Sequence, residues 1–236
     1  MKVERRTELR VERRGEAEAA GLSTLNSIPS QLRARAVFLD RDGVLVEERG
    51  YLHRVQDMVV LPGVSAALRR LQDAGFLLFV VTNQSGIGRG YYTLAEMEQV
   101  HARLEAELAR AGVHLTKIYF APEAPGQPSR GRKPSPQFLF DARDEFGVCL
   151  ARSYVVGDKL IDLECGWNAG VGQCLLVRTG YGAEVERQRP AALARAVVVD
   201  DLPAAAEWIL GQAGRPAAES SRTAQRDGAT AGLLQR

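Results

Sequence analysis

Two aspartates, Asp40 and Asp42, follow a short apolar run and come directly before a glycine, Gly43. Alternate residues on a strand point to the same face, and this pair lies where the strand is expected to end. Carboxylates at the carboxyl end of a buried strand can hold a hard divalent cation, and one of them can act as a nucleophile. A plain strand followed by an Asp-Gly turn explains the same residues, so the pair needs support from elsewhere in the chain.

That support comes from polar residues at the ends of two later apolar runs. Thr82 and Asn83 follow the run 76–81, and Asp158 follows the run 153–156. In parallel sheets ligands bind beyond the carboxyl ends of the strands, so these side chains are expected to lie close to the aspartate pair. Each of them alone also fits an ordinary turn.

Together the residues fit a phosphoryl-transfer site, in which an in-line nucleophile attacks phosphorus while the oxygens are neutralised. Asp40 would attack and Asp42 would protonate the leaving alkoxide. Asp158 would hold Mg²⁺ together with Asp40. The phosphate oxygens would be stabilised by hydrogen bonds and charge from Thr82, Asn83 and Lys133, with Arg132 beside the lysine.

The elements that must position these residues alternate along the chain. Apolar strands are expected at 36–40, 76–81, 117–120, 153–156 and 174–177, and 196–199 could add a sixth. Helical patterns are expected at 62–75, 93–112, 136–146, 159–170 and 203–210. This alternation predicts an α/β fold with a doubly wound, mainly parallel, Rossmann-like sheet.

The flanking segments are expected to lie outside this domain. Residues 1–33 are charged and poor in large apolar side chains, and residues 212–236 are small and polar. Both compositions favour disorder, which leaves 34–211 as the folded domain.

Composition excludes several classes of function. Lys plus Arg number 31 against 29 Asp plus Glu, so no basic surface for nucleic acid is expected. Three scattered cysteines without a CxxC pair argue against disulfides and cysteine zinc sites, and they favour a reducing compartment. No apolar run approaches the roughly 20 residues of a membrane helix. No secretory signal is expected from the charged N-terminus. We therefore expect a cytoplasmic protein, and a monomer.

The motifs resemble those of the haloacid dehalogenase-like (HAD) phosphatase superfamily. Asp40-x-Asp42-Gly43 is similar to its first motif, Thr82 to the second, Lys133 to the third, and Gly157-Asp158-x-x-x-Asp162 to the acidic fourth. Within it, the runs 38–43, 81–90, 132–134 and 156–159 most resemble the D,D-heptose 1,7-bisphosphate 7-phosphatase group, which is related to the histidinol-phosphate phosphatases.

The resemblance implies a role for each matching residue. Asp40 would be the nucleophile and Asp42 the acid/base, and Thr82 and Lys133 would stabilise the phosphoryl group. The metal ligands would be Asp40, Asp42 and Asp158, with Asp162 behind them. The substrate contacts would be Glu48, Arg49, Gly50, Tyr51, Thr82, Asn83, Gln84, Ser85, Arg132, Lys133 and Lys159.

One departure from the family is plain. Many members have a zinc loop with Cys-x-His and Cys-x-Cys, and the matching positions here are Ala121, Glu123, Ser129 and Gly131. These residues cannot replace thiolate and imidazole ligands, so no structural zinc is expected. The resemblance also implies a minimal cap or none, since no apolar domain lies between Gly43 and Pro62.

Three functions remain open at this point. The first is a Mg²⁺-dependent phosphomonoesterase that hydrolyses the 7-phosphate of D-glycero-D-manno-heptose 1,7-bisphosphate, a small sugar phosphate. The second is a histidinol-phosphate phosphatase or another small-metabolite phosphatase. The third is a non-catalytic nucleotide- or phosphate-binding module. The module lacks support, because Gly86, Gly88 and Gly90 miss the GxGxxG spacing.

Overall fold

The computed structural model describes residues 34–188 and 190–213. The predicted disordered segment 1–33 and nearly all of the predicted tail, 214–236, lie outside the described residues.

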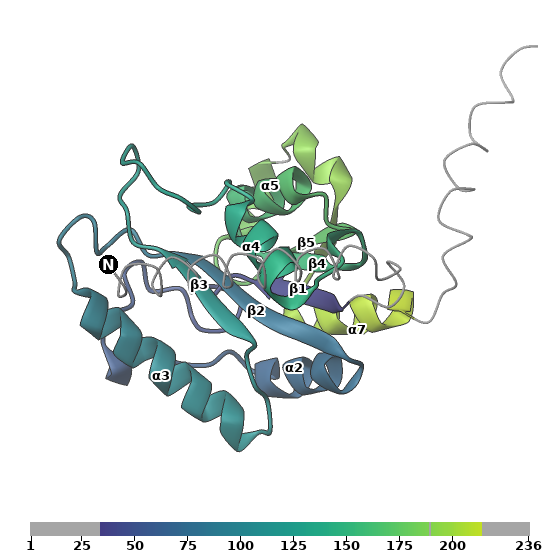
Figure 1. The fold of residues 1–236 in the computed structure, drawn as a ribbon, viewed down its shortest axis with the longest axis horizontal. Helices are drawn as coiled ribbons and strands as arrows, with labels where there is room; N and C mark the ends of the chain where they lie inside the picture. Colours follow the sequence, from purple (N-terminus) through teal and green to yellow (C-terminus); the bar gives the residue numbers. More distant parts are fainter. Residues whose placement is uncertain (1–33, 189, 214–236) are drawn as a thin grey trace, which may run out of the picture.

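A six-stranded parallel sheet forms the centre of the domain, in the order β3-β2-β1-β4-β5-β6 (Figure 1). Every pairing between neighbouring strands is parallel. The strands are β1 Arg35–Leu39, β2 Phe76–Asn83, β3 Lys117–Ala121, β4 Tyr154–Gly157, β5 Gln173–Val177 and β6 Ala196–Val199. This arrangement confirms the predicted α/β class and places β1 in the interior of the sheet.

Helices cover both faces of the sheet, with α2, α3 and α7 on one side and α4 and α5 on the other (Figure 1). Val37 and Leu39 of β1 belong to the first of two hydrophobic cores, whereas Ala36 and Phe38 belong to the second. The continuous apolar run of β1 therefore reflects burial on both faces. The helices are α2 Val64–Asp73, α3 Leu94–Arg110, α4 Gln137–Phe146, α5 Leu160–Ala169, α6 Gly182–Gln188 and α7 Leu202–Ala213.

Local signals set several boundaries as predicted. Thr93 caps α3, because its hydroxyl accepts a hydrogen bond from the Glu96 backbone while the Glu96 carboxylate accepts one from the Thr93 backbone. Gly147 and Gly170 follow α4 and α5 in the left-handed conformation, which glycine adopts without steric cost.

Some elements differ from the prediction. β2 continues through Thr82 and Asn83, because these residues still pair with β3. Helix α6 and the short 3₁₀ helices η2 Val55–Asp57, η3 Leu150–Arg152 and η4 Ala191–Arg195 were not expected. Helix α7 extends through Gly211 to Ala213, so the helical fold runs two residues past the predicted boundary at 211. A glycine costs a helix only about 1 kcal/mol, which does not end one whose preceding turns pack on the core.

The segment between the aspartate motif and α2 forms no separate domain. Within this segment, Val46 forms β-bridges with Asp42 and with Val60. Val44, Leu45 and Val46 are fully buried. The carboxyl edge of the sheet therefore carries no inserted cap at this position. None of the helices in the described ranges combines the length and apolar character that a membrane crossing requires.

Candidate active site

The carboxyl ends of β1, β2 and β4 lie side by side, because β1 pairs with both other strands. Asp40 follows β1 directly, and its backbone N–H still donates to the Val156 carbonyl at 3.0 Å. Thr82 belongs to the end of β2, and Asp158 follows β4 directly. The sheet thus gathers the three predicted motifs at one edge.

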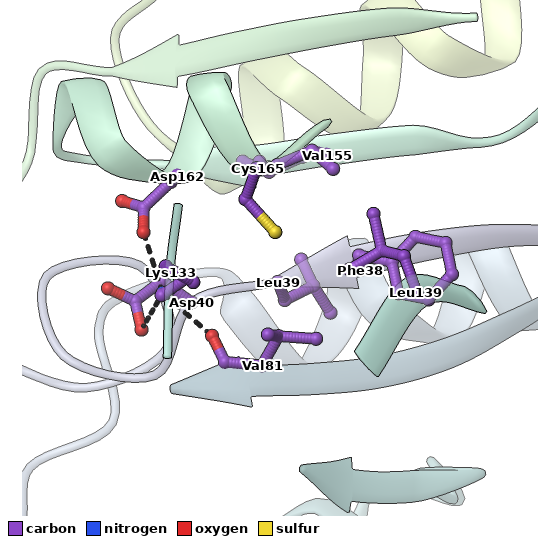
Figure 2. A pocket seen from close by; sticks show the side chains of 10 residues that line it. Phe38, Leu39, Asp40, Val81, Lys133, Leu139, Val155, Asp162 and Cys165 are labelled. Carbon is purple, nitrogen blue, oxygen red and sulfur yellow. Dashed lines mark hydrogen bonds and ion pairs between the residues drawn. The ribbon is translucent and has the colours of Figure 1, made fainter. Parts of the chain in front are cut away.

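Lys133 reaches this edge from the loop before α4. Its ammonium nitrogen lies 2.9 Å from Asp40 Oδ1 and 2.6 Å from Asp162 Oδ1, and it donates to the Val81 carbonyl at 2.7 Å (Figure 2). The lysine is only 5% exposed. Burial alone would lower its pKa, but the two carboxylates raise the pKa of Lys133 above its usual value, so the ammonium stays charged.

The same pairing keeps Asp40 ionised. Burial would raise the pKa of Asp40, but the ammonium groups of Lys133 and Lys159 and the Arg41 backbone N–H lower it below its usual value. A carboxylate that remains negative in a buried position is what a nucleophile requires.

The side chain of Asn83 holds Lys133 in place. Its amide oxygen accepts from the Lys133 N–H at 3.0 Å, and its amide nitrogen donates to the Lys133 carbonyl at 3.2 Å. Both ends of the Asn83 amide thus bind the backbone of the lysine, and the predicted contact of Asn83 with substrate stays a prediction. The pocket behind the lysine is lined mainly by apolar side chains, including Phe38, Leu139 and Val155 (Figure 2).

Three carboxylates could together hold a cation. Oxygens of Asp40, Asp158 and Asp162 lie within 4.8 Å of one another, and all three residues are buried. Burial, and next the charge of Asp40, raise the pKa of Asp158 to about 7, and burial also raises the pKa of Asp162. A cluster of hard oxygen ligands that repel one another fits Mg²⁺, which would relieve the repulsion.

Within this group both oxygens of Asp162 face groups of the protein. Its Oδ1 faces Lys133, and its Oδ2 accepts from the Lys159 backbone N–H at 3.0 Å. Both oxygens of Asp158 are contacted as well, by the Lys159 ammonium at 3.4 Å and by the Tyr181 N–H at 2.9 Å. That Asp162 lies behind the metal therefore stays a prediction.

Asp42 is held apart from that group by its neighbour Arg41. The guanidinium contacts both carboxylate oxygens of Asp42, with distances of 2.9–3.2 Å. Burial raises the pKa of Asp42, and Arg41 opposes the rise without cancelling it. A raised pKa favours proton donation by a carboxyl group near neutral pH. The side chain of Asp42, predicted as a metal ligand, does not join the carboxylate cluster.

The rim of the site carries most of the other predicted substrate contacts. Lys159 pairs with Glu48 at 2.9 Å, and its ammonium lies 4.4 Å from the ring centre of Tyr181. Glu48 also accepts from the Gly50 N–H at 2.7 Å, which fixes the turn before Tyr51. Tyr51 itself packs edge-on against the ring of Tyr91.

Two further predicted contacts lie in turns near this rim. Arg49 pairs with Glu47, and both side chains are exposed. Ser85 is half-buried in the turn after β2, where its backbone carbonyl accepts from the Arg89 N–H at 3.1 Å. Their contact with substrate stays a prediction.

The loop 122–136 is closed by hydrogen bonds. Ser129 donates to Glu123 at 2.6 Å, and the Ser129 oxygen accepts from the Arg132 backbone N–H at 3.2 Å. The guanidinium of Arg132 donates to the Glu123 carbonyl at 3.1 Å. These residues do not fit zinc, because Glu123 and Ser129 are already bonded to each other and Ala121 and Gly131 carry no ligand atom.

Sequence reasoning missed three residues near the site, namely Arg41, Tyr92 and Tyr181. The backbone N–H of Tyr181 donates to Asp158 Oδ2 at 2.9 Å, after β5. The rule that predicted Asp158, polar groups at the carboxyl ends of strands, also applies to the turn after β5. No comparable sequence signal indicated Arg41, a charged residue that is 1% exposed.

Comparisons with known proteins agree with this geometry. A family model described as HAD-hydrolase-like matches residues 131–205. A D-glycero-D-manno-heptose-1,7-bisphosphate 7-phosphatase of Thermosynechococcus vestitus is 41% identical and covers 74% of this chain and 94% of its own. The D-glycero-beta-D-manno-heptose-1,7-bisphosphate 7-phosphatase of Escherichia coli K12 is 41% identical over 66% of this chain and 85% of its own.

Solved structures give the same picture. The D,D-heptose 1,7-bisphosphate phosphatase of B. bronchiseptica, complexed with magnesium and phosphate, has a TM-score of 0.70 at 32% identity, covering 75% of this chain and 99% of its own. The enzyme of Burkholderia thailandensis has a TM-score of 0.58 at 31% identity, with coverage of 75% and 98%. This chain belongs to the HAD-like hydrolases and, among them, to the family of the heptose-bisphosphate phosphatases.

Proposed function

We propose that the protein is a Mg²⁺-dependent phosphomonoesterase that removes the 7-phosphate of D-glycero-D-manno-heptose 1,7-bisphosphate. The observation that carries the proposal is the buried, charged Asp40 at the end of β1, paired with Lys133, in a chain about 40% identical to enzymes with that name. The sheet edge is the ligand edge of this class of fold.

Each residue has a separate task in the reaction. The Asp40 carboxylate attacks phosphorus and forms an aspartyl-phosphate, and the bond to the leaving oxygen breaks. Asp42 gives its proton to that alkoxide, and then takes one from the water that hydrolyses the intermediate. Thr82 donates to a phosphate oxygen.

Lys133 contributes charge more than hydrogen bonds. Its three N–H groups already face Asp40, Asp162 and the Val81 carbonyl. In a buried site a fixed positive charge still stabilises the negative oxygens of the transition state.

The cation would be held by the carboxylates of Asp40 and Asp158, with Asp42 contributing through its backbone carbonyl. When bound, Mg²⁺ neutralises phosphate oxygens and orients the phosphoryl group. No zinc is needed for the loop 122–136, because the bond between Ser129 and Glu123 closes it.

A substrate panel on the purified full chain tests the proposal. With Mg²⁺ we expect phosphate release from heptose 1,7-bisphosphate at a kcat/KM well above that for histidinol phosphate, and loss of activity with EDTA. Asp40→Asn, which keeps the shape but cannot attack, should lower kcat by about 10⁴-fold or more. Preference for histidinol phosphate would overturn the substrate assignment, and inertness towards heptose bisphosphate, histidinol phosphate and an aryl phosphate would overturn the activity itself.

Metal analysis tests the zinc statement separately. The protein should contain far less than one zinc per chain, and a zinc-selective chelator should leave its thermal stability unchanged. Stoichiometric zinc would show that the loop binds the metal with other ligands.

A further inference from the structure

The side-chain amide of Gln84 lies at the centre of a buried polar network beside the site. The residue is 2% exposed. Its nitrogen donates to Thr82 Oγ1 at 2.9 Å and to Asp42 Oδ2 at 3.0 Å. Its oxygen accepts from Arg41 Nη2 at 3.1 Å and from the Tyr92 hydroxyl at 2.7 Å. Both amide hydrogens and both oxygen lone pairs are therefore used inside the protein.

The network allows only one orientation of this amide. Arg41 Nη2 can only donate, so the group facing it has to be the Gln84 oxygen. A flipped amide would place its NH₂ against that guanidinium and its oxygen against the carboxylate of Asp42. The amide nitrogen must therefore face Thr82 and Asp42.

This orientation decides what the Thr82 hydroxyl can do. Because its oxygen already accepts from Gln84, its own hydrogen is directed away from the amide. That hydrogen is then available for a phosphate oxygen, the role required of this residue.

The same amide makes the two oxygens of Asp42 unequal. Oδ2 receives the Gln84 N–H as well as the Arg41 contacts, whereas Oδ1 receives Arg41 alone. Oδ1 therefore accepts fewer hydrogen bonds than Oδ2 and is the oxygen better able to carry the proton that is exchanged with the substrate.

We propose that Gln84 is a positioning residue that directs the Thr82 hydrogen and the Asp42 Oδ1 atom towards the substrate, and that Tyr92 locks it in this orientation. The inference rests on the proposed phosphatase function and deepens it. It replaces the expectation that the Gln84 side chain itself contacts the substrate.

The surroundings of Tyr92 fit the role of a lock. The ring is 6% exposed and stacks on His53, with ring centres 5.3 Å apart and an angle of 4° between the planes. Gly86 allows the ring to approach closely, because a Cβ at that position would overlap it. The tyrosine hydroxyl is thus held against Gln84 by the packing of its ring against His53 and Gly86.

The test compares two conservative variants in the same turn. Tyr92→Phe removes the hydroxyl that holds Gln84. Tyr91→Phe removes the hydroxyl of the preceding residue in the sequence, which is exposed. Each variant is assayed with an alkyl phosphate, whose leaving group needs a proton, and with 4-nitrophenyl phosphate, whose leaving group needs none.

For Tyr92→Phe we expect kcat on the alkyl phosphate to fall about tenfold, part of the ~10²–10⁴-fold that a positioned acid contributes. KM should stay within about twofold. The rate of the first 4-nitrophenolate burst should fall less than alkyl turnover, because the burst uses the Thr82 hydrogen but not the proton of Asp42. Tyr91→Phe should behave as wild type in every assay. The inference would be overturned if Tyr92→Phe had the same kcat on the alkyl phosphate as Tyr91→Phe. It would also be overturned if Tyr92→Phe lowered the burst rate by the same factor as the alkyl turnover.

Gln84→Glu provides a second and larger change. Its carboxylate cannot donate to Thr82 or Asp42, so alkyl turnover should fall at least tenfold further than in Tyr92→Phe. If Gln84→Glu folds, judged by thermal denaturation, and keeps wild-type alkyl turnover, the inference is wrong. If it does not fold, the two tyrosine variants decide alone. Failure of wild type on all phosphates would instead contradict the proposed function.

Discussion

The two halves of the site differ in how firmly they are held. At the sheet edge the charged side chains of Asp40, Lys133 and Asp162 are at most 7% exposed, and each faces an opposite charge. On the rim, Tyr51 is 42% exposed and packs mainly against Tyr91, another exposed ring. The groups that would carry out the chemistry are therefore fixed by the fold, whereas the groups that would contact the sugar are fixed by short turns. Changes at the edge should affect stability and turnover together, and changes on the rim should affect substrate binding.

The largest effect on stability is expected for Lys133→Met. It leaves the buried carboxylates of Asp40 and Asp162 without their partner, which costs about 3–5 kcal/mol when a buried pair is broken. Lys117→Met is the matched control, because its pair with Glu145 is exposed on both sides and worth about 1 kcal/mol or less. Urea denaturation of the two variants measures the difference. An equal loss of unfolding free energy in the two variants would contradict the contrast between the buried sheet edge and the exposed surface.

A smaller effect is expected from His101, which is buried in α3 and has an Nε2 atom without a hydrogen-bond partner in the described chain. Burial, and next the charge of Arg41, lower the pKa of His101 from 6.5 to about 3. Between these values the unfolded chain binds the proton and the native state does not, so stability falls as the pH drops below about 6.5. At pH 5 this amounts to about 2 kcal/mol.

His101→Leu should remove that part of the acid sensitivity. The loss of unfolding free energy between pH 7 and pH 5 should become about 2 kcal/mol smaller than in wild type. The control variant replaces the exposed His114 by Leu in the same way. An unchanged loss in the His101 variant would mean that this side chain is protonated in the native state. This measurement tests whether the buried His101 is neutral in the native state, in contrast to the buried Asp40 and Lys133 at the sheet edge, which are charged.

The smallest effect is expected on the rim. Tyr51→Ala should raise KM for heptose bisphosphate by about fivefold, the equivalent of roughly 1 kcal/mol of lost contact. It should leave kcat unchanged and alter the unfolding free energy by no more than about 0.5 kcal/mol. A fall in kcat without a change in KM would place Tyr51 with the chemistry of the edge and weaken the distinction between the two halves.

Much of the arrangement could be predicted because the relevant signals are local or follow a general rule. Apolar runs marked the six strands, and the Thr93–Glu96 pair marked the start of α3. The rule that ligands bind at the carboxyl ends of parallel strands then predicts that Asp40, Thr82 and Asp158 share one edge of the sheet. The short 3₁₀ helices and α6 were missed, because segments of this length carry little periodicity.

The sequence by itself determined the fold class and which residues make up the motifs. Only the tertiary structure decided which groups each polar side chain contacts. Asn83 and Gln84 were both predicted as substrate contacts, and the structure shows their amides bonded to Lys133 and to Asp42 and Thr82, respectively. The physical reason is that a hydrogen bond between residues far apart in sequence depends on which strands are neighbours and on how their side chains pack. Neither the neighbouring strands nor the side-chain packing can be read from the spacing of residues along the chain.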